Sequence, residues 1–214
     1  MKTKKLYVVG SQKNYANFVD SFILVDNIKD ADVVIFTGGE DVDPSLYGCK
    51  RHPSTFSNIS RDLAEKAEFE KISPKQLVVG ICRGSQFLCV MNGGKLIQNV
   101  YNHALGHTHM ITEIGTSKIY EITSTHHQMQ YPFNLPIDQW QCLFATVGKN
   151  LSGRYEGDGI ENVPYEPEIV LYHRENAPKC LAIQGHPEYM RHDSPIVIRI
   201  NEIINSLLAN KNEN

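Results

Sequence analysis

The sequence lacks any long hydrophobic run and any basic excess. Near the N-terminus the apolar stretch LYVVG ends after five residues, too short for the core of a signal peptide or for a transmembrane helix. The 21 lysine and arginine residues face 24 aspartate and glutamate residues, giving a formal charge of -3. Nucleic acid and anionic membranes are therefore not expected as partners. We expect a cytoplasmic protein that acts on a small molecule.

Paired cysteines are missing as well. The five cysteines form an odd set without closely spaced pairs, which argues against a disulfide framework and against a zinc ribbon. No repeat, low-complexity tract or linker is visible, and 214 residues with 41% hydrophobic residues can bury one sizeable core. We expect residues 1–214 to form a single domain. The oligomeric state is not determined by the sequence, which is compatible with a homodimer.

The sequence does contain short apolar segments that predict strands, and these alternate with predicted helices. A β-rich stretch follows from about 95 to 175. An amphipathic helix then begins near Ser194 and Pro195. In the first half, the predicted strands are residues 5–9, 22–25, 31–36 and 77–81, and the predicted helices are residues 15–21, 61–72 and 83–92. This order predicts an α/β fold of three layers, flavodoxin-like, with a mostly parallel central sheet and a β-rich insertion in the second half.

The segment VVGICRGSQ places a cysteine between a predicted buried strand and a helix. Gly80 and Gly84 lie two residues on either side of Cys82, which is the nucleophile elbow pattern with cysteine in place of serine. The sharp turn strains the backbone of the nucleophile, and only glycine fits easily at the flanking positions. The helix N-terminus would stabilise a thiolate. We therefore predict that Cys82 is the nucleophile, whereas Cys89 is expected to be a packing residue.

The segment AIQGHPEY offers a general base and a group to orient it. His186 follows the apolar strand CLAI, and Glu188 comes two residues later, so both side chains would point to one side of an extended segment. The carboxylate can then hold the imidazole that takes the thiol proton and later protonates the leaving amine. A lone histidine beside a glutamate is more often part of a solvated loop. Together with the elbow, it predicts a triad of Cys82, His186 and Glu188.

GICRGSQ and QGHPE together resemble the class I glutamine amidotransferase fold. Further segments resemble its γ-glutamyl hydrolase branch, which includes γ-glutamyl-γ-aminobutyrate hydrolase. These segments are FTGGEDVDPSLYG at 36–48, RDLAE at 61–65, NGGKLIQ at 92–98, THHQ at 125–128 and DGIE at 158–161. In order and rough spacing, the resemblance covers about residues 30 to 190.

The resemblance implies a site as well as a fold. It assigns Cys82, His186 and Glu188 as the catalytic triad and requires neither a cofactor nor a metal. It implies an oxyanion hole formed by the backbone N–H of Arg83 and by a second donor in the glycine turn, for which Gly39 is the candidate. The residues that it places around the substrate are Gly38, Gln86, His127 and Gln128.

Two further groups of polar residues carry weaker expectations. His103, His107 and His109 have a spacing that could bind a metal, but their segment contains no cysteine or carboxylate. We therefore expect no metal site there. Asp41 and Asp43 follow the glycine turn and could form a pocket rim, although acidic loop residues are more often simply solvated.

These features support two main functional hypotheses. The first is a stand-alone cysteine hydrolase that cleaves a γ-glutamyl amide through a thioester and releases glutamate and an amine. The second is a glutaminase subunit that supplies ammonia to a partner synthetase, which would need a docking surface. The DVDP, RDLAE and HHQ elements favour the hydrolase. An intact triad argues against a purely regulatory protein, while peptidase or deglycase chemistry stays open, as does the identity of the amine.

Overall fold

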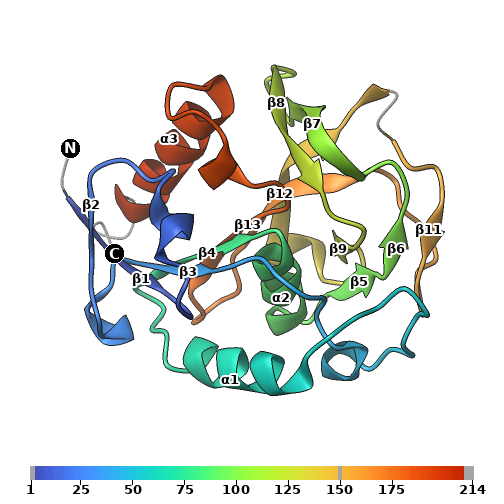
Figure 1. Ribbon diagram of the computed structural model, residues 1–214, viewed down its shortest axis with the longest axis horizontal. Helices are drawn as coiled ribbons and strands as arrows, with labels where there is room; N and C mark the ends of the chain where they lie inside the picture. Colours follow the sequence, from blue (N-terminus) through green and yellow to red (C-terminus); the bar gives the residue numbers. More distant parts are fainter. Residues whose placement is uncertain (1–2, 149–150, 210–214) are drawn as a thin grey trace.

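In the computed structural model, residues 3–148 and 151–209 are described, and their largest element is a nine-stranded sheet with helices on both faces (Figure 1). The strand order is β2-β1-β3-β4-β13-β12-β10-β7-β8. Its first five strands pair in parallel, in the order typical of flavodoxin-like sheets. These strands are β1 (Lys4–Val8), β2 (Phe22–Leu24), β3 (Val33–Phe36), β4 (Leu77–Ile81) and β13 (Lys179–Ile183).

The β-rich second half continues the same sheet with antiparallel strands. These strands are β12 (Pro167–Tyr172), β10 (Trp140–Thr146), β7 (Ala104–Glu113) and β8 (Ile119–Thr125). Four short strands form two separate ribbons, in which β5 (Lys95–Ile97) pairs with β9 (Met129–Tyr131) and β6 (Asn99–Val100) pairs with β11 (Tyr155–Glu156). The predicted α/β class is confirmed, with a mixed sheet that is parallel in its N-terminal part and antiparallel beyond β13.

The helices form the two outer layers. Helices α1 (Ile59–Phe69) and α2 (Arg83–Met91) cover one face, whereas α3 (Pro195–Ala209) covers the other, as Figure 1 shows. All residues of β3 and β4 are buried because both faces of these strands are covered. Within residues 3–148 and 151–209, the short 3-10 helices are η1 (Lys13–Ala16), η2 (Ile28–Asp30), η3 (Pro44–Tyr47), η4 (Ile137–Gln139) and η6 (Pro187–Tyr189).

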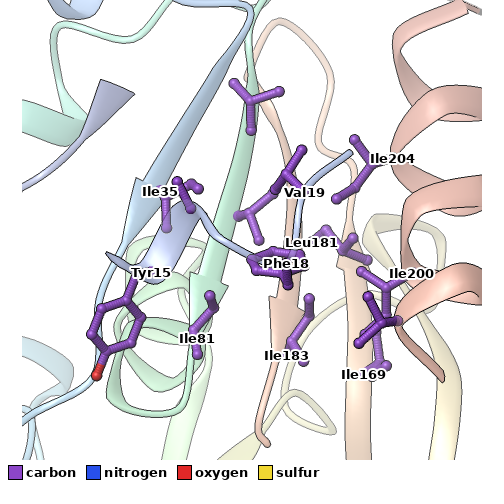
Figure 2. Packing of buried hydrophobic residues seen from close by; sticks show 14 of the residues in the cluster. Tyr15, Phe18, Val19, Ile35, Ile81, Ile169, Leu181, Ile183, Ile200 and Ile204 are labelled. Atoms are coloured by element: carbon purple, nitrogen blue, oxygen red, sulfur yellow. The ribbon is translucent and has the colours of Figure 1, made fainter. Parts of the chain in front are cut away.

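The core under α3 is filled by alternate residues of the sheet and by one stripe of the helix. Figure 2 shows Ile200 and Ile204 of α3 packed toward Leu181 and Ile183 of β13, with Phe18 between the layers. Burying one such aliphatic side chain stabilises the fold by about 1.5–3 kcal/mol. The amphipathic pattern that predicted the terminal helix thus also predicted the face that it buries.

The helix predicted over residues 15–21 is wrong, because the structure forms only the single turn η1. Phe18 and Val19 are buried, and the neighbouring backbone is satisfied by α3 instead of by a helical ladder. Asn201 donates from Nδ2 to the carbonyl of Phe18 over 2.8 Å, and its Oδ1 accepts from the N–H of Asp20 over 2.9 Å. Tertiary hydrogen bonds have replaced local ones.

Across the described ranges, none of the helices has both the length and the apolar character needed to cross a membrane. All five cysteines are free thiols, and Cys89 is fully buried, as expected of a packing residue.

Candidate active site

Cys82 lies at the junction of β4 and α2 in a strained backbone conformation. Its φ of 52° and ψ of -110° are unusual for a residue with a Cβ atom. The flanking glycines are required by space, because a Cβ on Gly80 would collide with the backbone carbonyl of Gly84 and a Cβ on Gly84 would collide with that of Phe36. The Cys82 N–H donates to the carbonyl of Ile183 over 2.8 Å. The predicted elbow is therefore present and is tied to the end of β13.

His186 follows β13, and its ring is close enough to the sulfur of Cys82 for that group to raise the pKa of the imidazole. Its Nδ1 is 2.7 Å from Oε1 of Glu188, whose side chain is almost fully buried. The His186 N–H donates to Oγ1 of Thr123 over 2.7 Å, and the ring stacks on Tyr189 with centroids 4.7 Å apart. The structure thus brings the three predicted triad residues together.

The electrostatics of this contact favour a charged imidazole. Burial opposes the charge of His186, but hydrogen bonds and charges from Cys82 and Glu188 outweigh burial and raise the pKa of His186 to about 10. The carboxylate reaches the ring through a tight turn, since Pro187–Tyr189 forms η6. The segment around Glu188 was expected to be extended but forms a 3-10 turn. This turn still places the Glu188 carboxylate against the His186 ring.

The glycine turn after β3 lies beside His186 and is held by α1. A Cβ on Gly38 would lie 3.2 Å from Cε1 of His186, which places the turn next to the triad. Arg61 donates from Nη2 to the Gly38 carbonyl over 2.8 Å, and the backbone of Gly39 has a φ of 141°. In a trans peptide the carbonyl and the following N–H point in opposite directions. Fixing the Gly38 carbonyl toward α1 therefore turns the Gly39 N–H away from α1.

Arg83 contributes its backbone to the site and its side chain to the scaffold. It is the first residue of α2, where backbone N–H groups have no partner within the helix. Its guanidinium is buried and forms ion pairs with Asp62 and Glu65 of α1. The Arg83 side chain thus locks α2 onto α1.

A cavity of about 190 Å³ opens beside Cys82, between the glycine turn and the 125–128 segment. On its rim, Nε2 of His127 is 3.0 Å from Oδ1 of Asp41. This hydrogen bond raises the pKa of His127 against the effect of burial. Asp43 instead caps η3 by accepting from the Ser45 N–H over 3.0 Å. The rim hypothesis therefore fits Asp41, whereas Asp43 shapes the loop.

A larger cavity of about 660 Å³ is lined by Gly38, Gly39 and Arg61 but does not reach Cys82. Chemistry at the thiol is therefore assigned to the smaller cavity.

Gln86 and Gln128 are both buried in the wall behind the thiol. Gln86 donates from Nε2 to the backbone carbonyl of Gln128 over 3.0 Å, and Gln128 donates from Nε2 to Oγ1 of Thr55 over 3.1 Å. Both residues line the cavity beside Cys82. Their amide nitrogens are engaged by protein, so direct contact with substrate stays a prediction.

Sequence reasoning missed several residues that support the triad. Arg61 belongs to the RDLAE segment, one of those that resemble the γ-glutamyl hydrolase branch, so this residue could have been predicted to support the site. Tyr189 and Thr123 hold the ring and the backbone of His186. Tyr15 of η1 lies with its ring centroid 6.2 Å from that of His186, and burial first, then the nearby charge of Glu188, raises its pKa. No feature of the N-terminal sequence indicates this contact.

Comparison with known proteins gives a family match over more than half of the chain. The model of the family described as peptidase C26 matches residues 18–142. Protein NtpR of Enterococcus hirae is 37% identical over 94 residues, which are 43% of this chain and 36% of NtpR. The glutamine amidotransferase-like protein YvdE of Lactococcus lactis is 27% identical over 188 residues, 82% of this chain and 69% of YvdE. The chain thus spans only about a third of NtpR.

Solved structures support the same fold. A crystal structure of a Thermoplasma acidophilum protein assigned as part of a GMP synthase matches with a TM-score of 0.62 and 14% identity, covering 100% of this chain and 98% of that chain. At this identity, the likeness shows the architecture alone.

Proposed function

Because this chain belongs to the peptidase C26 family and carries Cys82 on a class I glutamine amidotransferase-like fold, we propose that it is a cysteine hydrolase of γ-glutamyl amides. The observation that carries the proposal is a strained elbow cysteine at the end of β4, beside an imidazole that is itself held by a buried carboxylate after β13. This is the arrangement that nucleophilic catalysis with a thiol requires.

In the acylation step, the sulfur of Cys82 attacks the γ-carbonyl carbon of the substrate. The C–S bond forms as the carbonyl π bond opens, and the tetrahedral intermediate then expels the amine. His186 donates its proton to the departing nitrogen, and Glu188 stabilises the charged ring before that transfer. The products of this step are a γ-glutamyl thioester on Cys82 and a free amine.

In the deacylation step, water attacks the thioester with the now neutral His186 as general base. The second tetrahedral intermediate releases glutamate and frees the sulfur of Cys82, while the proton taken from water stays on His186. The net reaction consumes one water for each amide and involves no change of oxidation state.

The negative charge of each tetrahedral intermediate falls on the former carbonyl oxygen. We assign the N–H groups of Arg83 and Gly39 as its donors, since one lies at the N-terminus of α2 and the other faces away from α1. Removing one such donor from an enzyme typically costs about 3–4 kcal/mol of transition-state stabilisation.

The charges on the rim suit the head group of a γ-glutamyl substrate. That head group carries an α-ammonium and an α-carboxylate, and the rim offers the carboxylate of Asp41 beside the imidazole of His127. We propose that this pair recognises the two charges, with Gln86 and Gln128 forming the wall that the γ-carbonyl side chain lies against. Gly38 would approach the substrate from the turn beside His186.

The test is hydrolysis by the purified chain alone, assayed as glutamate released from a panel of γ-glutamyl amides that includes free glutamine. We expect at least one amide to be cleaved and Cys82→Ala to remove the activity. Cleavage of glutamine only when a second protein is added would instead support a glutaminase that supplies ammonia to a synthetase. A folded wild-type chain that cleaves none of the panel would overturn the proposal.

A further inference from the structure

A second group of buried polar side chains lies in the antiparallel half of the sheet. His109 is on β7 and His103 directly precedes this strand, Glu168 is on β12, and His126 lies between β8 and β9. Each of the four residues is at most 3% exposed. Candidate ligand atoms of His103, His109 and Glu168 all lie within 4.8 Å of one another. Four ionisable side chains thus share one small volume of the interior.

Three ring nitrogens surround one oxygen of Glu168. Its Oε1 is 3.4 Å from Nε2 of His109, 3.6 Å from Nδ1 of His103 and 3.8 Å from Nε2 of His126. In the part of the chain that the structure describes, none of these nitrogens has a hydrogen-bond partner. Ligands about 2.1 Å from a tetrahedral metal ion lie about 3.4 Å apart. For His103, His109 and Glu168, the spacing therefore matches ligands around a shared ion better than it matches hydrogen-bonded pairs. His126 lies just outside this group, 3.8 Å from Oε1 of Glu168, so its ring would have to move inward to become the fourth ligand.

The outward-facing ring nitrogens fix two tautomers that suit a metal. Nε2 of His103 is 3.0 Å from Oε2 of Glu166, and Nδ1 of His126 is 2.9 Å from the carbonyl oxygen of Gln128. Both oxygens act as acceptors, so each of these nitrogens carries the ring proton. In the neutral ring, the other nitrogen then presents its lone pair toward Glu168. Metal-binding histidines commonly donate their second nitrogen to a carboxylate or a carbonyl in this way.

The supporting carboxylates are also held in place. Oε1 of Glu166 accepts from the Ser152 N–H over 2.6 Å and from the Tyr155 hydroxyl over 2.8 Å. Oε1 of Glu168 accepts from Oγ1 of Thr146 over 2.8 Å, while its Oε2 has no partner among the described residues. Buried polar atoms without partners are unfavourable, and a cation at the centre would give a partner to the three ring nitrogens that face Oε1.

We propose that His103, His109, His126 and Glu168 bind one divalent transition-metal ion of the zinc class. Imidazole nitrogens with one carboxylate suit Zn²⁺, and four protein ligands without an open position are typical of a structural site. The expectation that this region binds no metal rested on the lack of a carboxylate near residues 103–109. The structure supplies that carboxylate from β12, and it leaves His107 exposed, with its Nδ1 2.9 Å from the Leu105 carbonyl.

The ion would stiffen one wall of the pocket beside Cys82. The carbonyl oxygen of Gln128 accepts from Nδ1 of His126 and also from Nε2 of Gln86. A metal on the other nitrogen of His126 would therefore fix the segment that carries His127 and Gln128. The site itself is separate from the proposed hydrolysis and does not depend on it.

The experiment is metal analysis of the purified chain after loading with Zn²⁺ or Co²⁺ and extensive dialysis. We expect about one ion per wild-type chain. His109→Asn and Glu168→Gln should lose it, whereas His107→Asn on the same strand should retain it. The supporting variant Glu166→Gln should weaken Zn²⁺ binding by about 10- to 100-fold.

The spectrum of the Co²⁺-loaded wild-type chain tests the ligand set without relying on a variant that folds poorly. We expect visible ligand-field absorption of a tetrahedral nitrogen and oxygen site with no thiolate charge-transfer band. A folded wild-type chain that retains no more than a trace of either ion would overturn the proposal. So would a thiolate band that Cys82→Ala removes, or an ion content that His109→Asn leaves unchanged in a folded chain.

Discussion

Arg61 of α1 donates from Nη2 to the carbonyl oxygen of Gly38 over 2.8 Å, and so holds the turn that faces the triad. Its Nε donates to one oxygen of Glu65 over 2.8 Å, and the other oxygen of Glu65 pairs with Arg83. A single carboxylate thereby links the two segments whose N–H groups we assign to the oxyanion. Arg61 is a positioning residue, because it acts on the reaction through the turn.

Replacing Arg61 by lysine should lower kcat by about 10- to 100-fold with little change in KM, because a lysine cannot make the forked contacts that hold the Gly38 carbonyl and Glu65 together. Steady-state kinetics with the best γ-glutamyl amide measure this split. Lys66→Gln, an exposed change on the same helix, should leave both constants as they are. An Arg61→Lys variant with wild-type kcat would contradict the assigned role.

The raised pKa of His186 predicts a specific loss of stability at high pH. Burial opposes the imidazolium, but Cys82 and Glu188 raise its pKa to about 10 in the folded chain, against about 6.5 when unfolded. Because the folded pKa is the higher one, the stabilisation is complete below about pH 6.5 and is lost as the pH rises to about 10. The difference in free energy of unfolding between wild type and His186→Asn should therefore shrink over this range.

Urea unfolding of both chains at about pH 6, 8 and 10 measures that difference. His192→Asn, which changes an exposed histidine of the following loop, should keep the pH profile of the wild type. A constant difference between wild type and His186→Asn across the range would show that the fold does not stabilise a charged His186.

The strained backbone at Cys82 predicts different stabilities for two variants that both lack the thiol. Its φ of 52° and ψ of -110° suit glycine far better than a residue with a Cβ. Cys82→Gly should therefore be more stable than Cys82→Ala by about 1 kcal/mol, the strain relieved less the entropy cost of glycine. Thermal and urea unfolding give the comparison. Equal stabilities, or a more stable Cys82→Ala, would mean that the strain at the elbow does not exceed the entropy cost of glycine.

Much of the parallel half of the sheet was predictable, because its strands are short apolar runs that are buried on both faces. The segment LVVGI coincides with β4, and α2 starts at Arg83, one residue after the predicted nucleophile. The glycine pair around Cys82 indicated the elbow, since only that backbone needs glycine at both positions.

What the sequence did not reveal depends on contacts between distant segments. The predicted helix stops at the η1 turn because Asn201, near the far end of the chain, satisfies the backbone of Phe18 and Asp20 just after it. Glu168 meets His109 only once β12 and β7 lie in one sheet, on either side of β10. Local sequence patterns carry no information about such pairings. The residues that support His186 and the histidine cluster around Glu168 could therefore be recognised only in the three-dimensional structure.

The most direct test of the central claim is to identify the nucleophile by covalent labelling. Incubation with a chloroketone or diazoketone analogue of glutamine, followed by peptide mass spectrometry, should show a single adduct on Cys82. Cys89→Ala should be labelled as fully as the wild type, since this thiol is fully buried, and Cys82→Ala should take up no label. An adduct on another residue, or full labelling of Cys82→Ala, would contradict the account.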